Sequence, residues 1–231
     1  MFFEEHAKLL SDFARVSQAA GARADYVQGG GGNTSVKLPG GLMAIKASGF
    51  CLSDIRPDKA YAVLDGADLR NFYLTTEPSA LADVEKEGSA RAKADIRHID
   101  GLADLRPSVE AGFHSILKTF VVHTHSVYAN LAACSTACRP IAAQAFAGAN
   151  YTWGWVPYTD PGANLTFAIR DELRRVEAET GKAPSVILMQ NHGIIVHDDD
   201  PDTALAIHTD ANERLARMFG LSGTCLLYTS P

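Results

Sequence analysis

Four side chains that can bind a metal ion stand in short, distinctive stretches of the sequence. His123 and His125 form an H-x-H pair in TFVVHTH, Glu110 ends the stretch RPSVE, and His192 lies in QNHG. Side chains at positions i and i+2 of a β-strand leave the same face, so the pair can reach one ion at about 2.0–2.1 Å. An isolated H-x-H more often consists of two hydrogen-bonded histidines. Three imidazoles with one carboxylate, however, are what a catalytic zinc-type site needs, and the sequence predicts such a site.

The segments next to these ligands have clear local signals. The β-branched and aromatic run 119–122 predicts a strand that carries the histidine pair. Pro107 suits the first turn of a helix, which is expected over 108–117. Within that helix His114 lies one turn after Glu110, so the two side chains face the same side. We expect His114 to support or pack against the site rather than to bind the metal.

The rest of the chain alternates between helical and strand patterns. Apolar periodicity and capping signals predict helices over 4–20, 126–135, 163–179 and about 200–219. Apolar and β-branched runs predict strands at 34–38, 42–45, 60–64, 141–146, 153–158, 186–189 and 194–197, with turns at 39–41 and 65–66. The hairpins argue against a purely parallel sheet. We therefore expect one α/β layered domain with a mixed, largely antiparallel central sheet flanked by helices.

Composition and charge exclude several classes of protein. The chain has 231 residues, 46% apolar content and a net charge of −6, without a basic stripe for nucleic acid. No stretch approaches the roughly 20 apolar residues of a membrane span, and the acidic start MFFEEHAKLL does not resemble a signal peptide. The four cysteines form neither a CxxC pair nor a secreted framework. A protein of the cytoplasm, with no membrane or nucleic-acid partner, is expected.

The glycine run 29–32 before Asn33 has two readings. It can be a flexible joint, or it can let backbone N–H groups approach a phosphate. It is neither a Walker loop nor a dinucleotide fingerprint, because the residues that those motifs require do not follow. Nearby, Lys46 could form a Schiff base if it were desolvated, but an exposed or phosphate-facing lysine is the stronger interpretation.

Taken together, five stretches resemble the class II aldolase/adducin family, which includes the fuculose-phosphate and rhamnulose-phosphate aldolases. The stretches are GGGGNTSVK, IKASG, RPSVE, VVHTH and LMQNHGIIV, in that order, and the resemblance runs from about Phe3 to Leu221. It implies that His123, His125 and His192 bind the metal. It also implies that Glu110 both binds the resting ion and acts as the acid/base.

The resemblance further implies a substrate phosphate site, at Gly32, Asn33, Ser48, Gly49 and Ser108. Two departures weaken that match. Ser48 stands where the compact aldolases usually have threonine, and Val109 replaces a second serine and so removes a hydroxyl donor. The resemblance also marks 73–105 as a probable surface insertion into a domain of residues 1–221. Within it, the charged stretch VEKEGSARAKAD fits a solvated helix.

By resemblance the activity is a zinc-dependent, or other divalent-metal-dependent, aldol cleavage or condensation of a phosphorylated ketose through an enediolate. Decarboxylase, epimerase and dehydratase reactions of related sugar acids or phosphates are alternatives on the same metal site, and a non-catalytic, adducin-like binding module is a third class. Family members are usually homotetramers. In the aldolases a tyrosine near the C-terminus of a neighbouring subunit assists catalysis, but the atypical tail 222–231 does not match that segment, so Tyr228 is not assigned.

Overall fold

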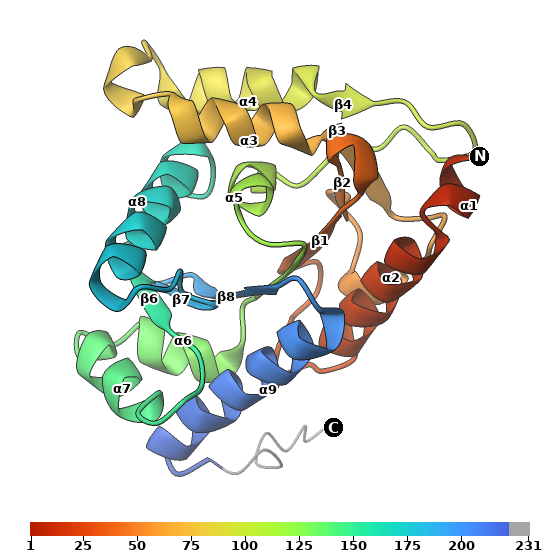
Figure 1. The fold of residues 1–231 in the computed structure, drawn as a ribbon. Helices are drawn as coiled ribbons and strands as arrows, with labels where there is room; N and C mark the ends of the chain where they lie inside the picture. The colour runs from red at the N-terminus through yellow and green to blue at the C-terminus, as the bar shows by residue number, and fades with distance from the viewer. Residues whose placement is uncertain (222–231) are drawn as a thin grey trace.

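The computed structural model describes residues 1–221, and it forms three layers with a sheet between two sets of helices (Figure 1). Eight strands make one sheet in the order β4-β3-β2-β1-β5-β8-β7-β6, and only β6 and β7 pair in parallel. The strands are β1 Asn33–Lys37, β2 Leu42–Lys46, β3 Tyr61–Asp65, β4 Ile96–Arg97, β5 Phe120–Thr124, β6 Trp153–Val156, β7 Val186–Met189 and β8 Gly193–Asp198. The expected mixed, largely antiparallel sheet is confirmed.

Helices cover both faces of the sheet. Helices α3, α5 and α8 lie on one face, with α4 packed outside against α8 and α5, while α2, α6 and α9 lie on the other with α7 beside them (Figure 1). The bounds are α1 Phe2–Glu5, α2 Ala7–Gly21, α3 Gly66–Thr75, α4 Val84–Ala94, α5 Ala111–Ile116, α6 Val127–Ala133, α7 Cys138–Ala145, α8 Ala163–Thr180 and α9 Pro201–Met218.

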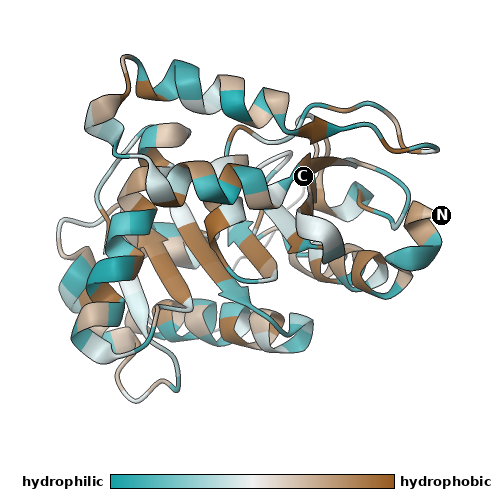
Figure 2. Cartoon of the chain, turned by 45° about the horizontal axis from the view of Figure 1, so that its top comes forward, coloured by the Kyte–Doolittle hydropathy of each residue, from teal (hydrophilic) through white to brown (hydrophobic). Residues whose placement is uncertain are grey.

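Strands β5, β7 and β8 are buried on both faces, which explains their apolar runs, whereas the buried strand β1 carries the polar residues Asn33, Thr34 and Ser35. In β5, Val121 belongs to the core under α3, α5 and α8, and its neighbour Val122 to the core under α2. In β8, Ile195 and Val196 divide between two cores in the same way. Figure 2 shows the strands largely brown between helices whose colouring is mixed. Alternation along β5 therefore directs His123 towards α5.

Four local expectations are wrong, each for a physical reason. The segment 4–20 is not one helix, because the chain breaks at His6 between α1 and α2. The pair Asp65-Gly66 does not form a turn. The Asp65 side chain accepts a hydrogen bond from Asp68 N and caps the N-terminus of α3. Residues 141–146 lie largely in helix α7 rather than a strand.

The fourth difference concerns the helix after Pro107, which begins at Ala111 rather than at 108. Pro107 pairs with Ala47 in an isolated β-bridge, and Ser108 N donates to the Lys46 carbonyl at 3.3 Å. The segment before α5 is thereby held against the end of β2. This shortening makes Glu110 the N-cap residue of α5.

The charged stretch within 73–105 forms helix α4, as expected. Its interpretation as an inserted segment stays a prediction, and the expected tail 222–231 falls outside the described residues. Within residues 1–221, no helix combines the length and apolar character needed to cross a membrane.

Candidate metal centre

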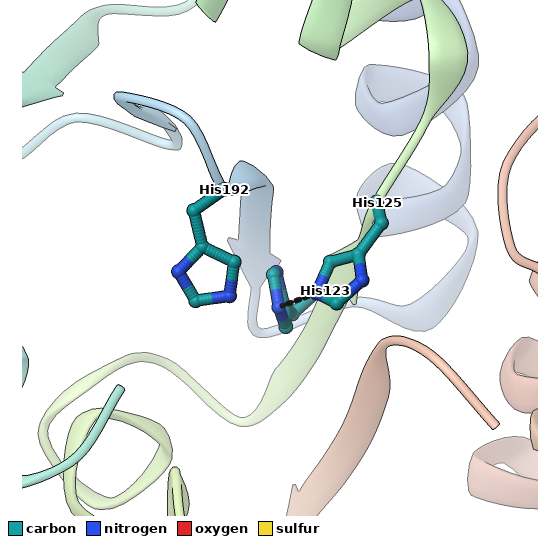
Figure 3. A group of neighbouring side chains, drawn as sticks. All are labelled: His123, His125 and His192. Carbon is teal, nitrogen blue, oxygen red and sulfur yellow. Dashed lines mark hydrogen bonds between the residues drawn. The ribbon is translucent and has the colours of Figure 1, made fainter. Parts of the chain in front are cut away.

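Three imidazoles meet at the end of strand β5 (Figure 3). One ligand nitrogen of each ring lies within 4.8 Å of the other two. His123 belongs to β5, His125 follows directly after that strand, and His192 lies on the turn between β7 and β8. The strand is thus one residue shorter than the H-x-H interpretation required, yet both histidines still face the same site.

The hydrogen bonds of His123 leave one ring nitrogen free for a metal. Its Nδ1 donates to the carbonyl oxygen of Ile194 at 3.0 Å, which leaves the lone pair on Nε2. That Nε2 lies 3.2 Å from Nε2 of His125. Tetrahedral ligands at about 2.1 Å from one ion stand roughly 3.4 Å apart. The two nitrogens therefore have the spacing of neighbouring ligands of a single ion.

Glu110 meets two of these histidines from the start of α5, and it lies outside the group of three whose ligand atoms are all within 4.8 Å of one another. Its Oε1 lies 3.2 Å from His192 Nε2, and its Oε2 lies 3.6 Å from His123 Nε2. Glu110 is 5% exposed. Its Oε1 and the Nδ1 atom of His192 are both buried without a hydrogen-bond partner among the described residues. Buried polar atoms are rarely left unpaired in this way. A cation held between the imidazoles and Oε1 would satisfy the carboxylate, so the residues fit a metal ion.

Burial and charge set the protonation that metal binding needs. Burial lowers the pKa of His123 to about 3, although the Glu110 carboxylate opposes this shift. Burial also lowers the pKa of His125. Burial raises the pKa of Glu110, but His123, His192 and the Asn33 amide outweigh it and hold that pKa well below its ordinary value. Neutral imidazoles beside an ionised carboxylate are the forms that bind a divalent ion.

A chain of hydrogen bonds behind Glu110 fixes the position of its carboxylate. A carboxylate only accepts, so Asn33 Nδ2 donates to Glu110 Oε2, at 2.5 Å. Asn33 Oδ1 must then accept from Nε2 of His114, and Nδ1 of His114 accepts from the Ser35 hydroxyl at 2.7 Å. Burial and then the nearby Lys37 lower the pKa of His114 well below its ordinary value, which keeps it neutral.

These hydrogen bonds confirm that His114 lies on the same side as Glu110 and supports it through Asn33. They also add Ser35, which the sequence did not single out. Only the antiparallel register of β1 with β5, in which Asn33 is opposite His123, brings Ser35 and Asn33 beside α5. No local motif in the sequence carries that information.

Two glycines allow the strands on either side of β5 to approach it closely. A Cβ at Gly193 would lie 2.4 Å from the Thr124 carbonyl oxygen, and a Cβ at Gly32 would lie 2.6 Å from the His123 carbonyl oxygen. Gly32 also has a left-handed φ of 69°. Glycine at 193 therefore serves a close backbone approach. The left-handed φ of 53° in that turn belongs to Asn191, a residue type that tolerates it.

The residues that the resemblance assigns to phosphate lie on three neighbouring segments: Gly32, Asn33, Ser48, Gly49 and Ser108. Asn33 Nδ2 donates to Ser108 Oγ at 3.1 Å, and Ser48 N donates to the Arg106 carbonyl at 2.8 Å. Ser48 and Gly49 are exposed. The structure thus brings the set together, while phosphate binding itself stays a prediction.

Lys46 lies beneath these segments and is 4% exposed, so the alternative of an exposed lysine is wrong. Its Nζ donates to the carbonyl oxygens of Phe50 at 2.6 Å and Gly30 at 3.3 Å. Burial lowers its pKa. The ammonium group ties the glycine run to the loop after β2, which is a structural task distinct from Schiff-base chemistry.

Comparisons with known proteins identify the family and the fold. The family model of the class II aldolase and adducin N-terminal domain matches residues 11–219. No curated protein sequence matches the chain significantly. Among solved structures, the N-terminal class II aldolase domain of a conserved protein from Thermoplasma acidophilum has a TM-score of 0.73 at 20% identity, covering 90% of this chain and 92% of the other.

Two further structures extend the likeness. YgbL from Klebsiella pneumoniae, a suggested aldolase/epimerase/decarboxylase, has a TM-score of 0.62 at 18% identity and covers 94% of this chain and 91% of its own. The L-fuculose-1-phosphate aldolase from Thermus thermophilus has a TM-score of 0.55 at 14% identity, covering 98% and 100%. These identities show a shared fold. With the family match over most of its length, the chain belongs to the class II aldolase and adducin N-terminal domain family.

Proposed function

We propose that this chain is a metal-dependent lyase that cleaves or forms a carbon–carbon bond in a phosphorylated ketose. The observation that supports this most is the convergence of three imidazoles, of which those of His123 and His192 also lie within 4.0 Å of the Glu110 carboxylate. Nitrogen and oxygen ligands of this kind suit zinc. A divalent ion bound there would act as a Lewis acid on the substrate carbonyl oxygen, and this supplies the electron sink for breaking the bond.

Glu110 is proposed to move the proton at the carbon beside that carbonyl. One of its oxygens is held by Asn33, so Oε1, once the substrate displaces it from the metal, is the atom proposed to carry the proton. In the protein alone the carboxyl is ionised, as a base must be. For Glu110 to return the proton as an acid, the pKa of its carboxyl must rise. Desolvation by the bound substrate acts in that direction.

The substrate phosphate is proposed to bind between the glycine run and the loops after β2 and before α5. The available donors are the backbone N–H groups of Gly32 and Gly49 and the hydroxyls of Ser48 and Ser108, beside the Asn33 amide. Val109, whose side chain is 75% exposed, contributes no hydroxyl there. Backbone N–H groups and hydroxyls of this kind are common phosphate ligands.

An epimerase, dehydratase or decarboxylase on the same site is the second candidate, and the name given to YgbL includes the epimerase and decarboxylase reactions beside the aldolase. The two readings differ in their products. Incubation with phosphorylated ketoses and sugar acids, followed by separate assays for dihydroxyacetone phosphate and carbon dioxide, distinguishes an aldolase from a decarboxylase. Neither product, together with absence of bound metal, would favour a non-catalytic, adducin-like module.

The role of Glu110 is tested by Glu110→Gln. Removing this proton-transfer group should reduce turnover by roughly 10²–10⁴-fold even when excess zinc keeps the three imidazoles loaded. Proton exchange at the substrate carbon in deuterated water should fall in parallel. Near-normal exchange at saturating metal would mean that another group moves the proton. Recovery of activity with excess zinc would reduce Glu110 to a ligand.

Assembly and location complete the proposal. We propose a homotetramer in the cytoplasm, following the family resemblance. Light scattering that gave a monomer at working concentration would rule out the tetramer and any catalytic group from a neighbouring subunit. Cell fractionation tests the location.

A further inference from the structure

A cleft of about 690 Å³ lies at the opposite end of β5 from the histidines, between that end of the sheet and helices α3 and α8. The cleft reaches Lys118 and Thr119 before and at the start of β5, whereas His123 and His125 lie at its other end. A five-residue strand spans roughly 16 Å. The cleft is therefore separate from the metal centre and from the proposed phosphate segments.

Basic side chains dominate the lining of this cleft. Five Lys and Arg residues line it against only two carboxylates, in a chain whose net charge is −6. The basic residues are Lys37, Arg70, Lys118, Arg170 and Arg174, and the acidic ones are Glu177 and Asp199. A local excess of positive charge on an acidic protein attracts anions to that place.

Three of these cations have no carboxylate within 4.0 Å among residues 1–221, whereas Lys118 and Arg170 do. Lys37 Nζ donates to the His114 carbonyl, and Arg70 Nη1 donates to the carbonyls at the end of α5. Arg174 uses only Nη2, which donates to the Leu74 carbonyl at 3.0 Å. A guanidinium has five N–H donors, so most donors of Arg70 and Arg174 are unused.

Capping of α5 accounts for part of this cluster, because cations stabilise the carbonyl end of a helix. Arg174, which lies on α8, donates in the same way to the Leu74 carbonyl in the last turn of α3, but through Nη2 alone. Burial first, and then the positive charge of Arg70, lower the pKa of Lys37 well below its ordinary value. A bound anion would raise that pKa again and favour the ammonium form of Lys37.

A buried histidine also lies on the wall of the cleft. His197 is 2% exposed and lines the cleft, and its Nε2 has no hydrogen-bond partner among the described residues. Its Nδ1 accepts from Lys118 N at 3.4 Å, so in the neutral ring Nε2 carries the proton and can donate. The Pro184 backbone also interacts with this ring and opposes the lowering of its pKa by burial, so the anion site proposed here rests on the cations and not on His197.

We propose that this cleft is a second anion site, which binds the phosphoryl group of a small phosphorylated molecule through Lys37, Arg70 and Arg174. Planar guanidinium groups match phosphate oxygens in pairs, and an ammonium group adds a point charge. The volume exceeds that of a phosphate group and lies in the range of small-molecule sites, so the phosphate is expected to carry an organic body. This proposal does not depend on the reaction at the metal centre.

Equilibrium dialysis of the full, metal-loaded chain tests it, with inorganic phosphate and glycerol phosphate as probes. The double variant Arg70→Gln/Arg174→Gln should weaken one class of phosphate site at least about tenfold. Arg139→Gln makes the same change of charge at an exposed arginine outside the cleft and should bind as the wild type does. The pair Ser48→Ala/Ser108→Ala removes donors near the metal centre and should leave the cleft site intact.

The proposal would be overturned if wild type and Arg70→Gln/Arg174→Gln bound phosphate equally. It would also be overturned if Ser48→Ala/Ser108→Ala abolished phosphate binding completely. Binding of inorganic phosphate without tighter binding of the ester would remove the organic body from it. If the double variant fails to fold, Arg174→Gln alone gives the same test, because that exposed side chain makes a single hydrogen bond. Its expected loss is again about tenfold.

Discussion

Replacing His114 with phenylalanine tests the chain of hydrogen bonds that holds Glu110. The new ring keeps the approximate volume of the imidazole and its stacking on Phe113, whose centroid lies 4.6 Å away. It removes the donor to Asn33 Oδ1 and the acceptor for the Ser35 hydroxyl, and all three residues are buried. Each buried group left unpaired costs about 1–3 kcal/mol, so His114→Phe should lower the free energy of unfolding by roughly 2–6 kcal/mol.

Denaturant unfolding at fixed protein concentration measures this loss, and Ser35→Ala supplies the control. Alone, Ser35→Ala should cost about 1 kcal/mol. In the His114→Phe background it removes a hydroxyl that has already lost its partner, so its cost should fall to zero or reverse sign. A His114→Phe protein within about 0.5 kcal/mol of wild type would refute the reasoning, and so would strictly additive effects of the two changes.

Two further predictions concern the frame around β5. Gly193→Ala places a Cβ against the Thr124 carbonyl and should lower the free energy of unfolding by about 1–3 kcal/mol. Gly30→Ala, whose Cβ would have no contact nearer than 3.8 Å, should change it little. Equal effects of the two variants would contradict the close approach of Gly193 to β5. Burial lowers the pKa of His208 to about 3, below its unfolded value of about 6.5, so its unfolded form binds the proton and stability falls as pH drops below 6.5. That loss should be about 2 kcal/mol at pH 5, and His208→Gln should flatten this part of the pH profile of unfolding; an unchanged slope would show that His208 does not contribute.

The sequence predicted the mixed, largely antiparallel sheet, because strands such as β5, β7 and β8 are short apolar runs with few competing interpretations, but it did not predict the two-residue strand β4. It failed where one signal has two structural uses. Asp65-Gly66 is a common turn pair, but here Asp65 caps a helix. The segment 141–146 contains isoleucine and phenylalanine, yet its alanines suit the helix that packs on α9.

The histidines could be predicted because strand alternation and short motifs place them locally. The support of Glu110 could not. Asn33 reaches it only through the register of β1 against β5, and the shortened helix α5 places Glu110 at its start through a contact with the end of β2. Such pairings between distant segments have no local signature, which is also why the basic cleft was not foreseen.

Metal content is the most direct test of the central claim. After dialysis against zinc-free buffer, elemental analysis of the wild-type chain should give close to one divalent ion per chain. His123→Ala and His192→Ala should each lose most of it, because three ligands rarely hold zinc as well as four. His98→Ala, which removes an exposed imidazole outside the centre, should retain the ion. Occupancy unchanged in both His123→Ala and His192→Ala would contradict the account.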